Sequence, residues 1–188
     1  VKVILHQDSH NSLRIVADDN IQEQIETSVH GNTLRIKMRN NICEAGPVTA
    51  YIYSKKYEGL GASGVVEIAS NGKLNVNDFT LDLSGSSKVA LELDAASVKT
   101  SSSGASEIFL KGQAGSHELH LSGSSSVQAP DFVVGRYKIE SSGSSNSKIN
   151  VLNELDISSS GSSDVEYRGN PSRISQDKSG SSSLRKVD

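Results

Sequence analysis

A Ser-Gly pair returns every 18 to 21 residues over most of this chain, and no other feature constrains its fold as strongly. A serine precedes each repeated glycine, and the glycines are Gly64, Gly85, Gly104, Gly123, Gly143, Gly161 and Gly180. A period of this size is the signature of a solenoid, because one such unit cannot bury its own apolar side and must stack on its neighbours. The repeat therefore predicts an architecture while leaving the chemistry open.

Apolar residues keep even offsets from each glycine, and this is the period of a β-strand. In the segment LDLSGSSKVALEL, the side chains of Leu81 and Leu83 are predicted to point inward before the turn. Those of Val89 and Leu91 are predicted to point inward after it, and that of Lys88 outward. Glycine permits the backbone conformation of a tight corner, and small serines let successive turns lie close together. Each unit is thus expected to be a strand, a Ser-Gly corner, a second strand and a looser return.

The fold predicted from these units is all-β, a right-handed single-stranded parallel β-helix of about seven Ser-Gly-cornered coils. Each coil would hydrogen-bond to the next at a spacing of about 4.8 Å, so that the stack rises roughly 30 Å. The serines before the glycines would form a ladder along one edge, hydroxyl over hydroxyl. We favour a structural role for this ladder over ligand binding.

One repeat departs from the pattern. The position four residues after Gly143 is Ser147, where the other units carry an apolar residue. We interpret the sequence GSSNSKI as a turn with two extra residues, after which Ile149 recovers the apolar position.

Both ends of a solenoid need protection against further strand pairing. The last unit loses apolar positions at Gln176, Lys178 and Lys186, and it is predicted to be a frayed or polar cap.

The N-terminal third lacks the Ser-Gly signal but is rich in strand-like segments. The turn HGNT at residues 30–33 is expected to join two of them as a hairpin. We expect one β-helix domain over residues 1–188, with regular repeats in 61–188. Residues 1–60 would form the first, irregular coils and cover the N-terminal end of the core.

Composition narrows the classes of partner. A net charge of −3 argues against nucleic acid, which needs a clustered basic face. No apolar run reaches the roughly 18 residues of a membrane span, so no transmembrane segment is expected. Cys43 is the only cysteine and is predicted to be a buried, inert thiol. The chain opens at Val1 in a strand-like segment, and we interpret it as a mature or trimmed form.

Two motifs match catalytic or cofactor patterns, but strand geometry argues against both. Residues 59–64 match GxGxxG, which needs a helix directly after it to bind a dinucleotide, whereas the strand-like VVEIAS follows here. Residues 145–148 and 175–178 match SxxK, whose two side chains share a face on a helix but not on a strand. We predict no cofactor and no catalytic residue.

The segment HELH is the best candidate for a metal site. His117 and His120 lie three residues apart on a predicted strand and so face opposite sides. Only Glu118 and His120 share a face, which is too few ligands for a closed site, and no metal is predicted. His117 occupies an apolar column, where we expect it to be packed and hydrogen-bonded.

The sequence also argues against an enzyme. In the outward column three residues after each glycine, acids alternate with lysine or serine. Neighbouring coils therefore form no carboxylate cluster of the kind that binds Ca²⁺ or performs acid-base catalysis. Glu67, Lys88 and Glu107 are expected to form a cross-coil charge ladder that contributes little to stability in water. The chain has no tryptophan, the commonest platform for stacking sugars.

The segment NIQEQIETSVHGNTLRIKMRN, followed by VTAYIYSKKYEGLGASGVVEI and repeated SGSSxV units, resembles the DUF2807 family of putative auto-transporter adhesin head GIN domains. The residues that fit its lead-in strands are Asn20, Thr27, Val29, Gly31, Leu34 and Ile36. The resemblance covers nearly the whole chain. It implies a β-helix shaped like the pectin lyases but without their catalytic residues, and a role in cell adhesion at the surface of Gram-negative bacteria.

The leading hypothesis is a non-catalytic interaction domain that is exported to the periplasm or cell surface and binds a host-cell or extracellular protein or glycan. The serines just after the corner glycines would be its repeated exposed hydroxyls: Ser86, Ser124, Ser144, Ser162 and Ser181. Two alternatives stay open. One is a polysaccharide-binding or degenerate lyase-like module, and the other is a structural homo-oligomer.

Overall fold

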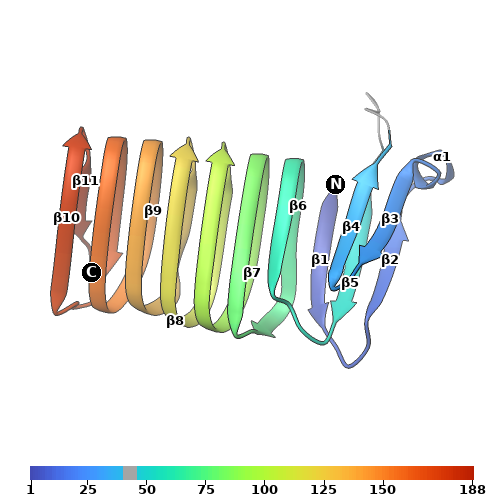
Figure 1. The fold of residues 1–188 in the computed structure, drawn as a ribbon, viewed down its shortest axis with the longest axis horizontal. Helices are drawn as coiled ribbons and strands as arrows, with labels where there is room; N and C mark the ends of the chain where they lie inside the picture. Colours follow the sequence, from blue (N-terminus) through green and yellow to red (C-terminus); the bar gives the residue numbers. More distant parts are fainter. Residues whose placement is uncertain (40–45) are drawn as a thin grey trace.

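The computed structural model describes residues 1–39 and 46–188 as a right-handed β-solenoid with an irregular N-terminal unit at one end (Figure 1). Cys43, the predicted buried thiol, lies outside the described residues. The solenoid consists of β6 (Gly59–Asn75), β7 (Asp78–Gly104), β8 (Glu107–Gly123), β9 (Ser126–Arg168), β10 (Arg173–Gly180) and β11 (Ser183–Lys186). The N-terminal unit consists of β1 (Lys2–Gln7), β2 (Ser12–Val16), α1 (Asp19–Gln22), β3 (Ile25–His30), β4 (Thr33–Met38) and β5 (Thr49–Ser54).

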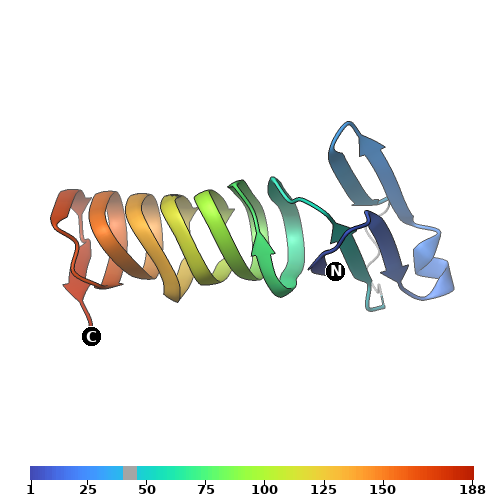
Figure 2. The ribbon, with the colours of Figure 1, turned by 90° about the horizontal axis from the view of Figure 1, so that it is seen from below.

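The coils stack in parallel register on their corner glycines. Gly64 pairs with Gly85, Gly104 with Gly123, and Gly123 with Gly143. The views from the side and from below show the coils advancing in one direction along a single axis (Figure 2). The predicted parallel β-helix of about seven coils is confirmed.

The core is one continuous column of apolar side chains inside the coils. Leu81, Leu83, Val89 and Leu91 are all buried, and Lys88 is exposed, as the strand period predicts. Equivalent residues of successive coils join them in a single cluster that extends from Leu5 to Val165. Stacking therefore buries the apolar side that no coil could bury alone.

Two separate constraints require glycine at the corners. The seven repeated glycines have φ between +85° and +119°, a region in which side chains with a Cβ are strained. In addition, a Cβ at Gly123 would lie 2.5 Å from the carbonyl oxygen of Gly104 in the preceding coil. Only the first corner escapes this second constraint, because a Cβ at Gly64 would meet no described atom within 4 Å.

The Gly143 unit corrects one prediction. Ser147 is 1% exposed and points into the core, as does Ile149 two residues later. The amide of Asn146, three residues after Gly143, donates to the carbonyl oxygen of Ser125, two residues after Gly123 (3.0 Å). The two turns are therefore still paired at the regular offset. This coil therefore has no extra residues. Its turn is regular, and a small polar side chain simply occupies a core position.

The inner side of the corner is lined by hydroxyls that we did not anticipate. The second residue after most corner glycines is a buried serine, and two of these form side-chain hydrogen bonds in the interior of the solenoid. Ser125 pairs with Ser102 (2.9 Å between the Oγ atoms), and Ser145 pairs with Ser141 (2.6 Å). The first coil differs, because its second residue after the glycine is Val66, which packs against the core.

The two ends of the solenoid differ. Every residue of β10 is exposed, which confirms the predicted polar C-terminal cap. At the other end, β1 pairs in parallel with residues 67–70 of β6, β5 pairs with β1, and β2 closes the sheet in antiparallel orientation. The predicted hairpin is confirmed as β3 and β4, joined through Gly31 (φ +59°).

The N-terminal unit covers only half of the first coil. Gly59–Val66, the part of β6 that leads into and around the first corner, pairs with β7 on one side, and no described strand pairs with it on the other. The N-terminal unit therefore lies against Glu67–Ser70 through β1 and leaves Gly59–Val66 without a partner strand on that side among the described residues. Among the described residues, no helix is long and apolar enough to cross a membrane.

The two constraints on the corner can be separated with a matched pair of variants. Gly64→Ala meets only the unfavourable φ, which costs about 1–2 kcal/mol. Gly123→Ala meets a similar φ and also the backbone of the preceding coil, so we expect a further loss of about 1–3 kcal/mol. For a chain of this size each kcal/mol lowers the melting temperature by about 2–4 °C. Equal melting temperatures for the two variants would show that the contact between coils does not require glycine.

Candidate functional site

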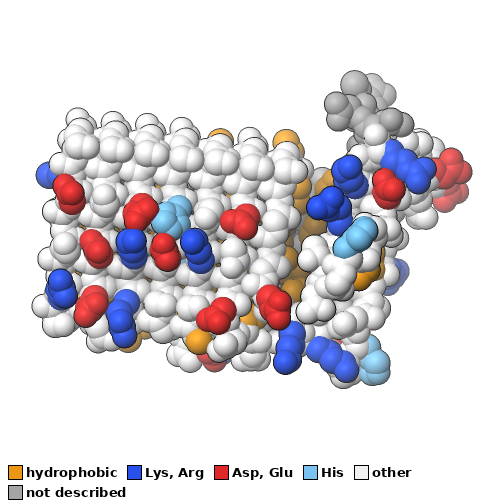
Figure 3. All heavy atoms as spheres, viewed as in Figure 1, with side chains coloured by type: hydrophobic (Ala, Val, Ile, Leu, Met, Phe, Trp, Pro, Cys, Tyr) orange, Lys and Arg blue, Asp and Glu red, His pale blue; other side chains and the backbone are white. Residues whose placement is uncertain are grey.

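Two rows of exposed serines flank the corner glycines, and we call this surface the serine edge. Figure 3 shows its margin along the top of the solenoid, without charged side chains. The row before the glycines comprises Ser63, Ser84, Ser103, Ser122, Ser142, Ser160 and Ser179, and the row after them comprises Ser86, Ser124, Ser144, Ser162 and Ser181. The side chains of both rows are exposed.

The expected hydroxyl-to-hydroxyl ladder is not formed. Within the described chain, the one hydrogen bond from the row before the glycines runs from Ser122 Oγ to the carbonyl oxygen of Ser102 (3.5 Å). The serines are stacked by their backbones and not by their side chains. Apart from the hydroxyl of Ser122, those of this row therefore remain free to bond water or a ligand.

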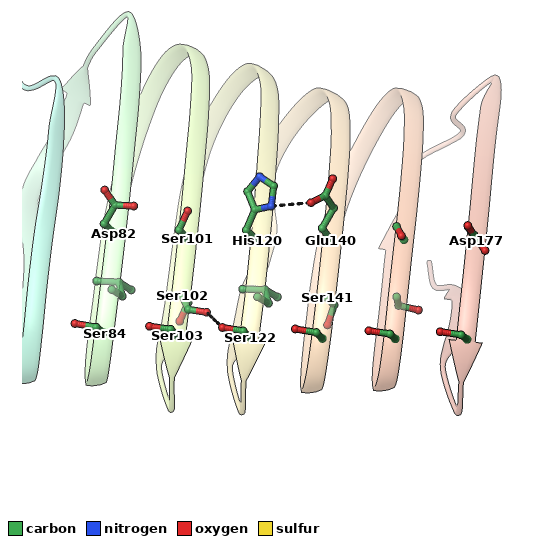
Figure 4. Close-up of a pocket in the computed structure, with 17 residues that line it drawn as sticks. Asp82, Ser84, Ser101, Ser102, Ser103, His120, Ser122, Glu140, Ser141 and Asp177 are labelled. Atoms are coloured by element: carbon green, nitrogen blue, oxygen red, sulfur yellow. Dashed lines mark hydrogen bonds and ion pairs between the residues drawn. The ribbon is translucent and has the colours of Figure 1, made fainter.

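An open groove of about 620 Å³ runs along the outer face beside the serine edge (Figure 4). It crosses six coils, each of which contributes the residues just before its glycine. One side is formed by the serines of the edge, and the other by Asp82, His120, Glu140 and Asp177. No lysine or arginine lines it, so the groove is polar and weakly acidic.

A charged cluster lies beside the middle of this groove, and two of its members, His120 and Glu140, line it. His120 Nε2 lies 2.5 Å from Glu118 Oε1, and its Nδ1 lies 3.0 Å from Glu140 Oε2 in the next coil. Lys138 Nζ lies 2.8 Å from the other oxygen of Glu140, and this hydrogen bond lowers the pKa of Glu140 and raises that of Lys138. Because a neutral imidazole carries one N–H, only a protonated His120 can donate to both carboxylates.

The sequence predicted half of this cluster. Glu118 and His120 share an outward face, as expected. The sequence prediction did not include Glu140, because this residue lies before a corner glycine and not in the outward column after it. Both His120 and Glu140 lie three residues before a corner glycine. Aligning the repeats on their glycines and comparing the residues before the turn would therefore have paired them. The described residues contain no cluster of three or more side chains that could hold a metal ion.

The charge ladder after the corner is formed in part. Lys88 pairs with Glu107 across coils (3.7 Å), as predicted. Glu67 pairs instead with Lys2 of β1 (3.6 Å), because the N-terminal unit adds a strand beside it. All four side chains are about half exposed, so these pairs contribute little to stability.

The two misleading motifs lie on strands, as predicted. GxGxxG falls within β6, which continues as a strand through Asn75. In the first SxxK match, Ser145 is buried and Lys148 is exposed, so the two side chains lie on opposite faces of β9. The second match, at 175–178, lies on the fully exposed β10.

His117 is a core residue, as expected. It is 1% exposed, and its Nε2 lies 2.9 Å from Thr100 Oγ1. Its ring packs against Phe132 and Tyr137 at centroid distances of 5.7 and 5.1 Å. Burial lowers the pKa of His117 from 6.5 to about 3, so the ring is neutral near pH 7.

This burial predicts an acid-sensitive fold. Below pH 6.5 the unfolded chain takes up a proton on His117 while the folded chain does not, so stability falls as the pH drops from about 6.5 to 3. Between pH 7 and pH 4 we expect the wild-type chain to lose about 2–3 kcal/mol more than His117→Leu. Urea unfolding of both proteins at the two pH values measures this difference. Parallel losses would show that His117 titrates normally in the folded chain.

The fold and this surface define a β-solenoid with an open, polar groove on its outer face. The chain belongs to the DUF2807 family, described as "Putative auto-transporter adhesin, head GIN domain", whose model matches residues 1–171. A comparison with curated proteins found no match.

Solved structures share the fold at low sequence identity. A putative adhesin from Bacteroides fragilis NCTC 9343 superposes with a TM-score of 0.91 at 20% identity, over 99% of this chain and 88% of that one. A putative lipid binding protein from Parabacteroides distasonis ATCC 8503 gives 0.69 at 18% identity, over 100% and 88%. A putative adhesin from the same organism gives 0.66 at 16% identity, over 99% and 88%. At these identities the likeness shows the fold alone.

Proposed function

We propose that this chain is a non-catalytic adhesion domain, exported to the periplasm or cell surface of a Gram-negative bacterium, that binds its partner through the serine edge. The observation that carries the proposal is the serine edge itself, two rows of exposed hydroxyls held by a stacked backbone. Membership in a family described as adhesin heads supports it. The similar folds of two proteins described as putative adhesins are consistent with it.

The surface suits contact over a long line. Serine hydroxyls both donate and accept hydrogen bonds, and successive coils repeat them at about 4.8 Å. Each direct bond contributes only about 0.5–1.5 kcal/mol, so useful affinity requires many of them at once. A rigid row supplies this number without the entropy cost of ordering flexible side chains. Residues 1–188 would act as one such unit.

The groove makes a glycan the partner we favour over a protein. Its walls combine serine hydroxyls with the carboxylates of Asp82, Glu140 and Asp177, which together can bond the hydroxyls of a neutral saccharide chain. A strongly anionic partner would meet acidic side chains and no lining lysine or arginine. The groove crosses six coils, which suits a polymer better than a small molecule.

The test removes the hydroxyls of one row at a time. We expect replacement of Ser86, Ser124, Ser144, Ser162 and Ser181 together by alanine to reduce binding to a glycan array and to cultured epithelial cells at least tenfold. Five lost hydrogen bonds at about 0.5–1.5 kcal/mol each account for this effect. Circular dichroism and melting temperature check that the coils stay intact.

A matched variant tests the other row. Alanine at Ser84, Ser103, Ser122, Ser142 and Ser160 removes the hydroxyls that line the groove and leaves the first set in place. Binding that depends on the groove is lost in this variant. If both variants bind as the wild type does, the serine edge is not the contact surface and the proposal fails. A concentration-dependent mass in light scattering would point instead to a structural oligomer.

A further inference from the structure

We propose that the uncovered edge of the first coil, Gly59–Val66, accepts an extended peptide strand from another protein in parallel orientation. This inference does not depend on the serine edge. It rests on unpaired backbone, exposed apolar side chains and the absence of any residue that would block pairing at this edge.

The unpaired backbone groups can be identified from one hydrogen bond. The amide of Thr80 donates to the carbonyl oxygen of Glu58 (3.0 Å), so the even-numbered residues here bond to β7. In a parallel sheet, alternate residues direct their N–H and C=O groups to opposite neighbours. Gly59, Gly61 and Ser63 therefore direct theirs to the open side, where no described strand lies.

Apolar side chains surround this edge. Leu60, Ala62 and Val66 are only partly buried although they pack against the core, because no coil precedes theirs. Val65 is 79% exposed, at a position that is serine or alanine in every later coil. Figure 3 shows apolar side chains exposed in the hollow between the solenoid and the N-terminal unit.

The edge lacks the devices that normally prevent strand addition. Exposed edges are usually protected by charged residues, by proline or by a bulge. The C-terminal coil follows this rule, since β10 carries Arg173, Asp177 and Lys178. The edge strand β2 carries Arg14. The sequence GLGASGVV of the first coil carries no charge and no proline.

The space fits a single strand and not a second solenoid. The continuation of the coil, at Glu67–Ser70, is already paired with β1, and β5 and β2 extend that sheet further. A complete coil of another molecule would therefore collide with the N-terminal unit. An extended segment of about five to eight residues would add backbone hydrogen bonds and place alternate apolar side chains over Leu60 and Ala62.

The probe is a fluorescently labelled peptide of residues 78–85, DFTLDLSG. This segment already pairs in parallel with Gly59–Gly64 on the opposite side, so its register and side-chain pattern suit the edge. Fluorescence anisotropy measures its binding to the complete chain. We expect saturable binding, and loss of binding when Leu81 and Leu83 of the peptide are both replaced by aspartate.

Two variants of one residue distinguish the contribution of its backbone N–H to peptide binding from the effect of an added side chain. Gly61→Pro removes an N–H that points to the open side and sacrifices no bond to β7, so we expect peptide affinity to fall at least tenfold. Gly61→Ser keeps the N–H, and its side chain points outward to where no described atom lies within 4 Å. We expect this control to bind as the wild type does.

Hydrogen exchange gives a second readout that does not need a variant. The amides of Gly61 and Ser63 should exchange rapidly in the free chain and slow at least tenfold when the peptide is bound, whereas the amide of Leu60 should be slow throughout. Protected amides at Gly61 and Ser63 in the free chain would overturn the proposal. So would the absence of saturable peptide binding, or equal binding by the folded Gly61→Pro variant.

Discussion

The close approach of one corner to the next is the contact on which the whole solenoid depends. At each corner after the first, the backbone of the preceding glycine occupies the place where a Cβ would be. Stacking at the spacing of a parallel sheet is possible only because the later residue of each pair lacks a side chain there. The register of every apolar column then follows from the register of the glycines. The core is thus a consequence of the corner, and a change at one glycine is transmitted to the residues on both sides of it.

The sequence predicted most of the architecture because this contact requires a glycine at every corner after the first, and the corner glycines recur at regular intervals. The columns of Leu81 and Val89, the polar last coil and the hairpin at Gly31 could all be read from spacing and residue type. Ser147 was misread, because an apolar column with one polar member resembles an insertion when only the residue type is considered. The hydrogen bonds between coils distinguish a regular turn from an insertion, and a single sequence does not reveal them.

The surface was harder to predict, because outward residues are not needed for stacking. His120 and Glu140 lie in neighbouring coils and are about 20 residues apart in sequence, so only the correct column alignment brings them together. For the stacked serines, the sequence predicted the position correctly but not the hydrogen bonding. Their regular spacing suggested a ladder of side-chain bonds, yet the backbone alone keeps them in line. A residue repeated for structural reasons can therefore leave its hydroxyl free for another use.

The same reasoning explains why the first coil is unlike the others. Gly64 keeps the conformation of a corner glycine, with φ +85°, although no preceding coil forces it to be glycine by contact. Each later coil satisfies the backbone groups of the one before it, and β1 satisfies those of Glu67–Ser70. Gly59, Gly61 and Ser63 are left with the geometry of a stacked coil and, on their open side, no partner among the described strands. A solenoid that protects its last coil with charges and leaves this segment neutral has one end that can still pair.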